Sequence, residues 1–149
     1  MPPVWMASEL MSFGQLSHWY AALKEPAVRQ SIANPFALDE TVFVPFVHHL
    51  SVIRNICAHH GRLWNRTFRV PLRLPRRRPE MVASAVNRTA PTNVYNTLAM
   101  IHFVLRTVEP KADWSKRLAS LIETLPVKGP EAMGFAPDWQ GHTLWKPAA

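Results

Sequence analysis

The sequence predicts an all-α fold, a small helical bundle in which residues 1–149 form one domain. Hydrophobic residues recur every three or four positions through most of the chain, which is the spacing of one helix face. Prolines and glycines fall mainly between these periodic segments, where they interrupt helices. With 149 residues and a hydrophobic share of 48%, the chain has enough apolar side chains for a single buried core.

The first predicted helix covers residues 4–23, and Gly14 weakens its middle. Its hydrophobic residues share one face: Met6, Leu10, Phe13, Leu16, Tyr20 and Leu23. Pro26 then opens a short helix. This helix ends before Asn34-Pro35, because proline disfavours helical backbone in the residue that precedes it.

A long central helix is predicted from Asp39, a favourable N-cap residue, to about residue 60. The face expected to point inward carries Phe43, Phe46, Leu50, Ile53 and Cys57. Pro45 either kinks this helix or lies in the first turn of a helix that begins later. Gly61 is the expected stop. On the inward face Cys57, the single cysteine, is expected to be a small buried hydrophobic residue.

Residues 61–80 are predicted to form an irregular basic loop, because the prolines of this segment exclude a long helix. Alternation of apolar and basic residues over 69–74 favours a short edge strand or hairpin arm. Between residues 62 and 78 the loop has no acidic residue and seven arginines: Arg62, Arg66, Arg69, Arg73, Arg76, Arg77 and Arg78. We expect these arginines to contact an RNA backbone. A solvated loop and a membrane-surface patch are the alternatives.

Two more helices are predicted, one over residues 92–109 and one from an Asp113 cap to about residue 125. A proline follows each of them and prevents its continuation. Residues 129–149 contain three glycines and three prolines, which favour an irregular tail. The tail is expected to be held against the bundle by its aromatic residues Phe135, Trp139 and Trp145.

The formal net charge of +7 and the pI of about 10.3 favour polyanionic partners, either nucleic acid or an anionic membrane surface. A single cysteine excludes an intramolecular disulfide and a cysteine zinc site. No secretory signal is recognisable, and no apolar segment reaches the ~20 residues of a membrane span. We therefore expect a cytoplasmic protein that binds RNA and not a membrane.

The segment 54–66 carries side chains suited to phosphodiester chemistry: Arg54, Asn55, His59, His60, Arg62, Trp64, Asn65 and Arg66. Arginine binds phosphate through a fork of donors, and histidine transfers protons near neutral pH. At about 100° per residue, His59 lies nearly opposite the predicted apolar face, with Asn55 one turn before it. Arg54 lies about 140° from His59. Either a long arginine bridges this angle, or two copies of the helix form a composite site across the two-fold axis of a homodimer.

This set predicts RNA cleavage without a metal or cofactor, by Arg54, Asn55 and His59. A neutral histidine accepts the proton of the 2′-hydroxyl, which attacks phosphorus, and a second, protonated histidine donates to the leaving 5′-oxygen. Arginine stabilises the charge on the phosphoryl oxygens, while asparagine holds the imidazole or a phosphate oxygen. Expected substrate-binding residues are His60, Arg62, Trp64, Asn65, Arg66, Arg76, Arg77 and Arg78.

Two alternatives stay open for these residues. Tryptophan stacks on nucleobases when it is exposed, but a tryptophan such as Trp64 is more often a packed anchor than a platform for a base. The histidine pairs His48-His49 and His59-His60 suggest a metal site only weakly, since their spacing matches no familiar ligand pattern.

The pattern Arg54-Asn55-x-x-x-His59 resembles the signature of the HEPN superfamily, and the whole string 54–66 resembles the hallmark of its Abi-like (abortive-infection) family. The segments 3–17 and 133–145 also look like parts of that family. The resemblance implies a HEPN-like all-α fold and a role in anti-phage defence or toxin-like growth arrest, with an antitoxin as a possible partner. It also implies ribonuclease activity that maps onto Arg54, Asn55 and His59.

Members of this family have an N-terminal helical half before the Pro-Val-Trp-Met segment, so the chain resembles only their C-terminal half. Two classes of function therefore compete. The intact motif favours a metal-independent endoribonuclease of the abortive-infection type. The missing half favours a non-catalytic RNA-binding or partner-binding module, a truncated or degenerate copy. RNA cleavage in the presence of EDTA distinguishes the two.

Overall fold

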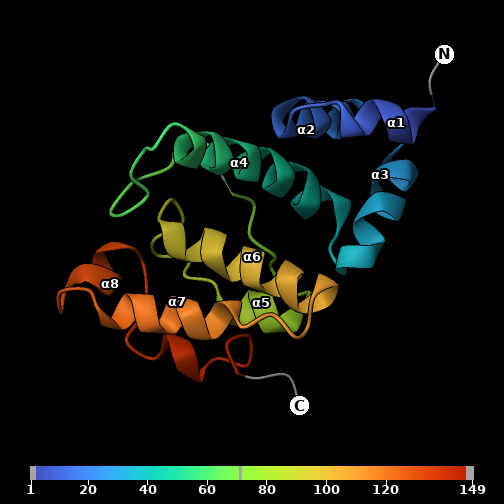
Figure 1. Cartoon of the computed structure of the whole chain (residues 1–149). Helices are drawn as coiled ribbons and strands as arrows, with labels where there is room; N and C mark the ends of the chain where they lie inside the picture. Colours follow the sequence, from blue (N-terminus) through green and yellow to red (C-terminus); the bar gives the residue numbers. More distant parts are fainter. Residues whose placement is uncertain (1–2, 71, 147–149) are drawn as a thin grey trace.

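A computed structural model describes residues 3–70 and 72–146, and these residues form α-helices and two 3-10 helices with no strand among them. The predicted all-α fold is confirmed. The α-helices are α1 (Val4–Glu9), α2 (Phe13–Ala22), α3 (Pro26–Ala33), α4 (Glu40–Ala58), α5 (Glu80–Ala85), α6 (Val94–Val108), α7 (Trp114–Glu123) and α8 (Gly129–Ala132). In Figure 1, α4 lies between the N-terminal helices above it and α6 below it, and α7 and the tail complete the other side.

The N-terminal segment forms two helices, so the prediction of one helix over residues 4–23 is wrong. Ser12 starts α2 with a capping box: its side chain accepts from the Gln15 backbone N–H, and its own N–H donates to the Gln15 side chain at 2.8 Å. Two backbone donors at a helix start are satisfied this way, which fixes the beginning of α2. The chain breaks at this cap, and Gly14 lies within the first turn of α2.

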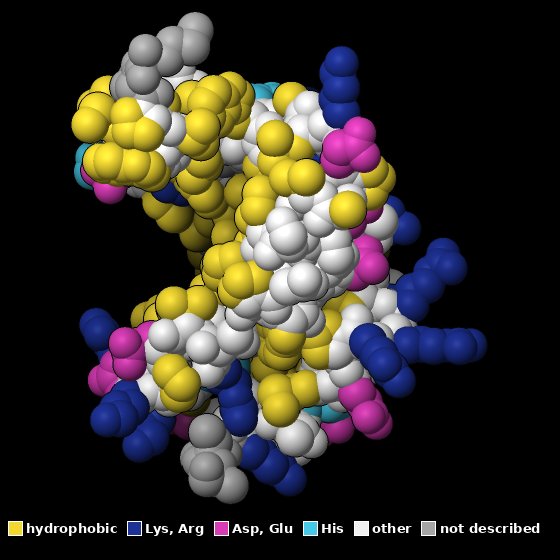
Figure 2. Space-filling model, turned by 90° about the vertical axis from the view of Figure 1, so that its right-hand side faces the viewer, with side chains coloured by type: hydrophobic (Ala, Val, Ile, Leu, Met, Phe, Trp, Pro, Cys, Tyr) yellow, Lys and Arg dark blue, Asp and Glu magenta, His cyan; other side chains and the backbone are white. Residues whose placement is uncertain are grey.

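Only the C-terminal part of the apolar face predicted for this segment reaches the core, at Tyr20 and Leu23. Met6, Leu10 and Leu16 are 44%, 85% and 37% exposed, whereas Tyr20 is buried. Leu16 and Tyr20 line an apolar groove beside α4 together with Phe13 and Leu23, whereas Met6 and Leu10 do not. Figure 2 shows hydrophobic side chains gathered over the N-terminal helices, with a hollow below them.

The third and fourth helices follow the prediction closely. α3 begins at Pro26 and ends at Ala33, before Asn34-Pro35. α4 begins after Asp39, whose carboxylate accepts from the Thr41 backbone N–H at 2.8 Å. Pro45 lies inside α4, so the alternative of a later start is wrong.

Within the described residues, α4 is the one helix long and apolar enough in composition to cross a membrane. The central helix of a globular protein meets the same criterion when other segments cover it. Six of its side chains are buried in this fold: Val42, Phe43, Phe46, His49, Ser51 and Ile53.

The inward face of α4 is rotated relative to the predicted one. Its last turns bury His49 and Ile53, whereas Leu50 is half-buried and Cys57 is exposed, so the expectation of a buried cysteine is wrong. His49 explains the rotation. Its Nδ1 lies 3.1 Å from the Val70 carbonyl, and its Nε2 lies 2.8 Å from the Thr97 hydroxyl of α6. A polar residue reaches the core here because both ring nitrogens have partners.

The basic loop returns along α4. It leaves the C-terminal end of the helix at Gly61, passes His49 at Val70, and reaches Asp39 at the N-terminal end near Arg73. Over residues 69–74 the structure has no strand at its described positions, and Pro71 lies outside them. The expected alternation is nevertheless present, because Leu72 is buried and Arg73 is exposed.

The C-terminal helices agree with the prediction to within a few residues, but α5 was not expected. Residues 92–109 contain α6, and the segment from Asp113 to residue 125 contains α7. α5 has only six residues, too few to show a helical repeat in the sequence.

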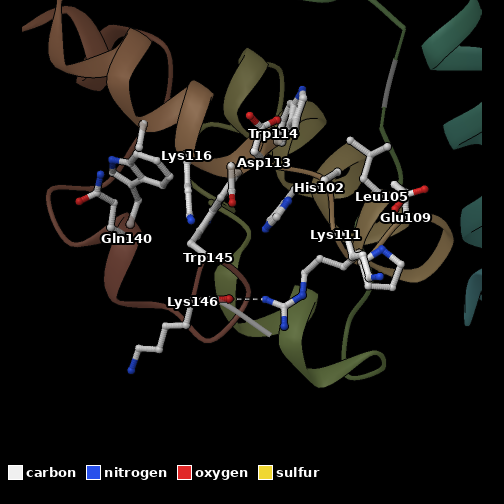
Figure 3. A pocket seen from close by; sticks show the side chains of 16 residues that line it. His102, Leu105, Glu109, Lys111, Asp113, Trp114, Lys116, Gln140, Trp145 and Lys146 are labelled. Atoms are coloured by element: carbon white, nitrogen blue, oxygen red, sulfur yellow. Dashed lines mark hydrogen bonds between the residues drawn. The ribbon is translucent and has the colours of Figure 1, made fainter. Parts of the chain in front are cut away.

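The tail is pinned by its aromatic residues as predicted, although it includes the short helix α8 and a 3-10 turn, Trp139–Gly141. The Phe135 ring centroid lies 4.8 Å from that of Tyr95, and the Trp145 ring centroid lies 4.8 Å from that of His102. Arg106 of α6 donates to three tail carbonyls, those of Thr143, Leu144 and Lys146. Figure 3 shows the bond to the Lys146 carbonyl as a dashed line. Residues 147–149, the end of the predicted tail, lie outside the described part.

Candidate functional site

The motif lies where α4 ends, and the ending has a defined geometry. The Gly61 N–H donates to the Ile56 carbonyl at 2.7 Å, and the His60 N–H donates to the Cys57 carbonyl at 3.0 Å. These two bonds form a Schellman motif with His59 as the C-cap. The predicted stop is thus in the right place. Gly61 is needed there, because a Cβ would lie 2.8 Å from Ile56 Cγ2 and 2.9 Å from its carbonyl oxygen.

The left-handed position of this cap is occupied by His60, with φ of 54°. Glycine is the usual residue there, since a side chain makes the left-handed region unfavourable by ~1–2 kcal/mol. Backbone strain of this kind is concentrated at functional sites. The turn holds two exposed histidines, His59 and His60, next to each other at the end of α4.

The structure brings Arg54 and Asn55 together. The Arg54 Nη1 donates to the Asn55 Oδ1 at 3.1 Å, and both side chains are exposed. Asparagine thus orients the guanidinium, a role different from the expected contact to imidazole or phosphate. Among the described residues no hydrogen bond joins His59 to either side chain.

The rotated core changes where the motif points. Measured from the buried face of α4, His59 lies about 110° to one side and Arg54 about 110° to the other, with Asn55 between them on the outer surface. His59 is therefore lateral and not opposite the core, although it is exposed as expected. All three side chains are exposed.

The residues that follow the motif differ in their roles. Trp64 is half-buried and packs against α8, where a Cβ on Gly129 would lie 2.6 Å from its ring. This contact supports the packed-anchor interpretation of Trp64. Asn65 has a left-handed φ of 47° and turns the loop. The side chains of His60, Arg62, Asn65 and Arg66 are exposed close to the motif in the chain.

The last three predicted substrate-binding residues are not near the motif. Arg76 and Arg78 line a cavity that includes Asp39 and Thr41, at the opposite end of α4. The 19 residues of α4 place the two ends about 28 Å apart. Arg77 is exposed between Arg76 and Arg78 but does not line that cavity. The predicted site therefore divides into a motif end and an arginine end.

The histidine pairs do not converge. His48 packs against His18 of α2, with ring centroids 5.3 Å apart, and His49 is buried. Within residues 3–70 and 72–146 no group of three or more His, Cys, Asp or Glu side chains is arranged to hold a metal ion.

The basic side chains of the motif and loop lack carboxylate partners. In the described part of the chain the one salt bridge joins Arg29 to Glu40 at 2.7 Å. Asp39 lies near the arginine end, and hydrogen bonds from Thr41 lower the pKa of its carboxyl, with a smaller contribution from Arg73. Unpaired arginines make this side of the molecule a favourable surface for a polyanion.

Comparison with known proteins finds a family match that includes the motif residues. Residues 1–65 match the model of the Abi-like protein family. The matched segment includes Arg54, Asn55 and His59, and it confirms the similarity to Abi-like proteins over these residues. It indicates a function related to abortive infection. Residues 66–149 lie outside the match, so the resemblance expected for the tail segment stays a prediction. No curated protein and no solved structure matches the chain.

Proposed function

We propose that the chain is a metal-independent endoribonuclease of the abortive-infection type, related to the HEPN superfamily, with Arg54, Asn55 and His59 at its centre. The observation that carries the proposal is the joint exposure of these three residues on the last turns of α4. The matched Abi-like segment includes all three. Its cellular role in this proposal is RNA cleavage in the cytoplasm during phage infection, under the control of an antitoxin or another trigger.

Each group has a role in the proposed reaction. His59 accepts the proton of a 2′-hydroxyl, whose oxygen bonds to the adjacent phosphorus. The bond to the 5′-oxygen breaks, and a second histidine donates a proton to that oxygen, which leaves a 2′,3′-cyclic phosphate and a 5′-hydroxyl. Arg54, held by Asn55, stabilises the negative charge on the phosphoryl oxygens.

The second histidine is either His60 of the same chain or His59 of a second copy. His60 is adjacent and exposed on the strained turn. A second copy is favoured by the angle of about 140° between Arg54 and His59, which leaves the motif of one chain open to a partner. We therefore include a homodimer with a composite site in the proposal.

Cleavage of single-stranded RNA in EDTA tests this function. We expect 2′,3′-cyclic phosphate products, and His59→Ala should reduce the rate by ~10²–10⁴-fold, the usual contribution of general acid–base catalysis. His18→Ala is a matched control, since His18 is an exposed histidine on α2. Equal rates for wild type and folded His59→Ala would reject His59 as the proton acceptor.

A second candidate is a non-catalytic RNA-binding or partner-binding module. The open surface around Arg54 and His59 favours it, because general acid–base sites are usually enclosed enough to exclude water. This candidate predicts RNA binding without cleavage, with or without EDTA.

A further inference from the structure

The arginine end of α4 forms a polar cavity of about 570 Å³. Its wall comes from the start of α4, the end of the basic loop and the segment before α6. Four arginines line it: Arg73, Arg76, Arg78 and Arg88. Asp39 is the single carboxylate in the lining, so the cavity has a large excess of positive charge. A cleft lined by one sign of charge concentrates ligands of the opposite sign, in this case anions.

The backbone around this cavity is well fixed. Leu72 and Pro75 are buried and anchor the loop on either side of Arg73. Arg88 donates to the carbonyl of Pro75, which joins the two segments that form the wall. The position of Arg88 is set by Asn87, whose Oδ1 accepts from the backbone N–H of Thr89 at 3.0 Å.

The negative charge of Asp39 is already engaged. Its carboxylate accepts from the Thr41 N–H and hydroxyl as the cap of α4. Asp39 therefore neutralises the arginines only in part. Its interaction with Arg73 is an electrostatic attraction between the two charges. The remaining guanidinium donors of Arg73, Arg76 and Arg78 are available to an anion.

We propose that this cavity binds a phosphate group of the RNA strand, at a distance from the motif. This inference rests on the proposed function. Arginine forks match the oxygens of a phosphate, and several together suit a dianionic or bridging phosphate. The inference adds Arg88 to the RNA surface predicted from the sequence and removes Arg77 from it, although Arg77 is flanked by two lining residues.

The course of the loop connects the two ends. Exposed Arg66 and Arg69 lie between the motif end and the cavity along the chain. A strand held at both ends must span about 28 Å, the length of α4. That span falls within the ~4–16 nucleotides that single-stranded sites cover. The cavity thus makes affinity depend on RNA length: a strand too short to reach both ends of α4 contacts only one of them at a time.

The test compares Arg76→Gln with Arg77→Gln, two exposed neighbours that differ in whether they line the cavity. We measure binding of 4-nucleotide and 12-nucleotide RNAs over a range of salt. Arg76→Gln should weaken the 12-mer by roughly 3–10-fold and lower its salt slope by about one, and should weaken the 4-mer less, because only the 12-mer contacts both ends at once. Arg77→Gln should have a clearly smaller effect on the 12-mer. Equal effects of the two variants would overturn the proposal that the cavity binds RNA.

A second measurement separates this inference from the proposed function. Inorganic phosphate is titrated against the wild-type protein while the side-chain NMR signals of its arginines are recorded. Shifts of Arg73 and Arg88 without any RNA cleavage would support an anion site and reject the ribonuclease. Shifts without a length dependence of RNA binding would show a free-phosphate site only, and would overturn the assignment to RNA. No shift and no length dependence would overturn the inference in full, whatever the cleavage activity.

Discussion

At the scale of single residues, the end of α4 has a strained backbone conformation at an exposed histidine. His60 has a φ of 54° in a position where glycine is the usual residue. His60→Gly should therefore raise the free energy of unfolding by ~1 kcal/mol, because the left-handed strain is relieved. Chemical denaturation of wild type and variant measures this difference in the free energy of unfolding. If His60 supplies the second proton, the same variant should lose RNA cleavage, and unchanged cleavage would leave the role to a second copy of His59.

Arg54 provides the second prediction at this scale. Its guanidinium donates to Asn55 and still presents further N–H groups to a phosphate. Lysine keeps the charge but lacks the planar fork, so Arg54→Lys should reduce RNA cleavage almost as much as Arg54→Ala. Initial rates of both variants provide the measurement. A lysine variant with wild-type rates would indicate that charge alone matters at this position.

At the scale of elements, the sequence predicts the long helices well and the short ones poorly. α4, α6 and α7 each span enough turns for their hydrophobic repeat to stand out. The break between α1 and α2 was overlooked because apolar residues continue through it. Its signal was nevertheless present, since Ser12-x-x-Gln15 is a capping-box pattern.

The division of the site into a motif end and an arginine end follows from the path of the basic loop, which the sequence does not predict. The order of residues 54–66 determines the motif end, so local spacing is enough to predict it. The position of Arg76 and Arg78 depends on the loop folding back along α4, which a partly buried contact between His49 and Val70 fixes. That contact joins residues 21 apart, and periodicity carries no information on such pairs. Arg88 was missed for the same reason.

At the scale of the whole molecule, two buried histidines link the elements. His49 joins α4 to the loop and to α6, and His102 joins α6 to the tail through its stack with Trp145. Burial lowers the pKa of both imidazoles below the ordinary value of 6.5, and for His102 the charge of Arg106 lowers it further. The unfolded chain then binds protons more readily than the folded one.

This linkage predicts the pH dependence of stability. The contribution of both histidines is fully present above pH 6.5 and is lost as the pH falls through their lowered pKa values. The Tm should therefore decrease on acidification from about pH 8 to about pH 5. His102→Phe keeps an aromatic ring in the stack and removes one titrating group, so its Tm should depend less on pH. An equally steep dependence in this variant would exclude His102 as a contributor.

The last prediction concerns self-association, for which the structure offers a surface separate from the motif. An apolar groove of about 790 Å³ lies between the N-terminal helices and α4, and exposed hydrophobic residues on its rim include Val4, Trp19 and Val28. Monomeric proteins rarely leave a surface of this kind uncovered. Of the residues of α4 that line the groove, Val47 is the nearest to the motif in the chain, and it lies about 18 Å along the helix before His59. A dimer formed through the groove therefore need not bring two motifs together.

Two matched substitutions distinguish the roles of this surface. Val28 and Val127 are both exposed valines, but only Val28 lines the groove. We expect light scattering at micromolar concentration to show a dimer for wild type and Val127→Glu, and a monomer for Val28→Glu, because a buried carboxylate without a partner is strongly unfavourable. A composite active site requires that cleavage fall together with the dimer. Full cleavage by a strictly monomeric Val28→Glu protein would show that one chain contains the complete site, and would assign the second proton transfer to His60.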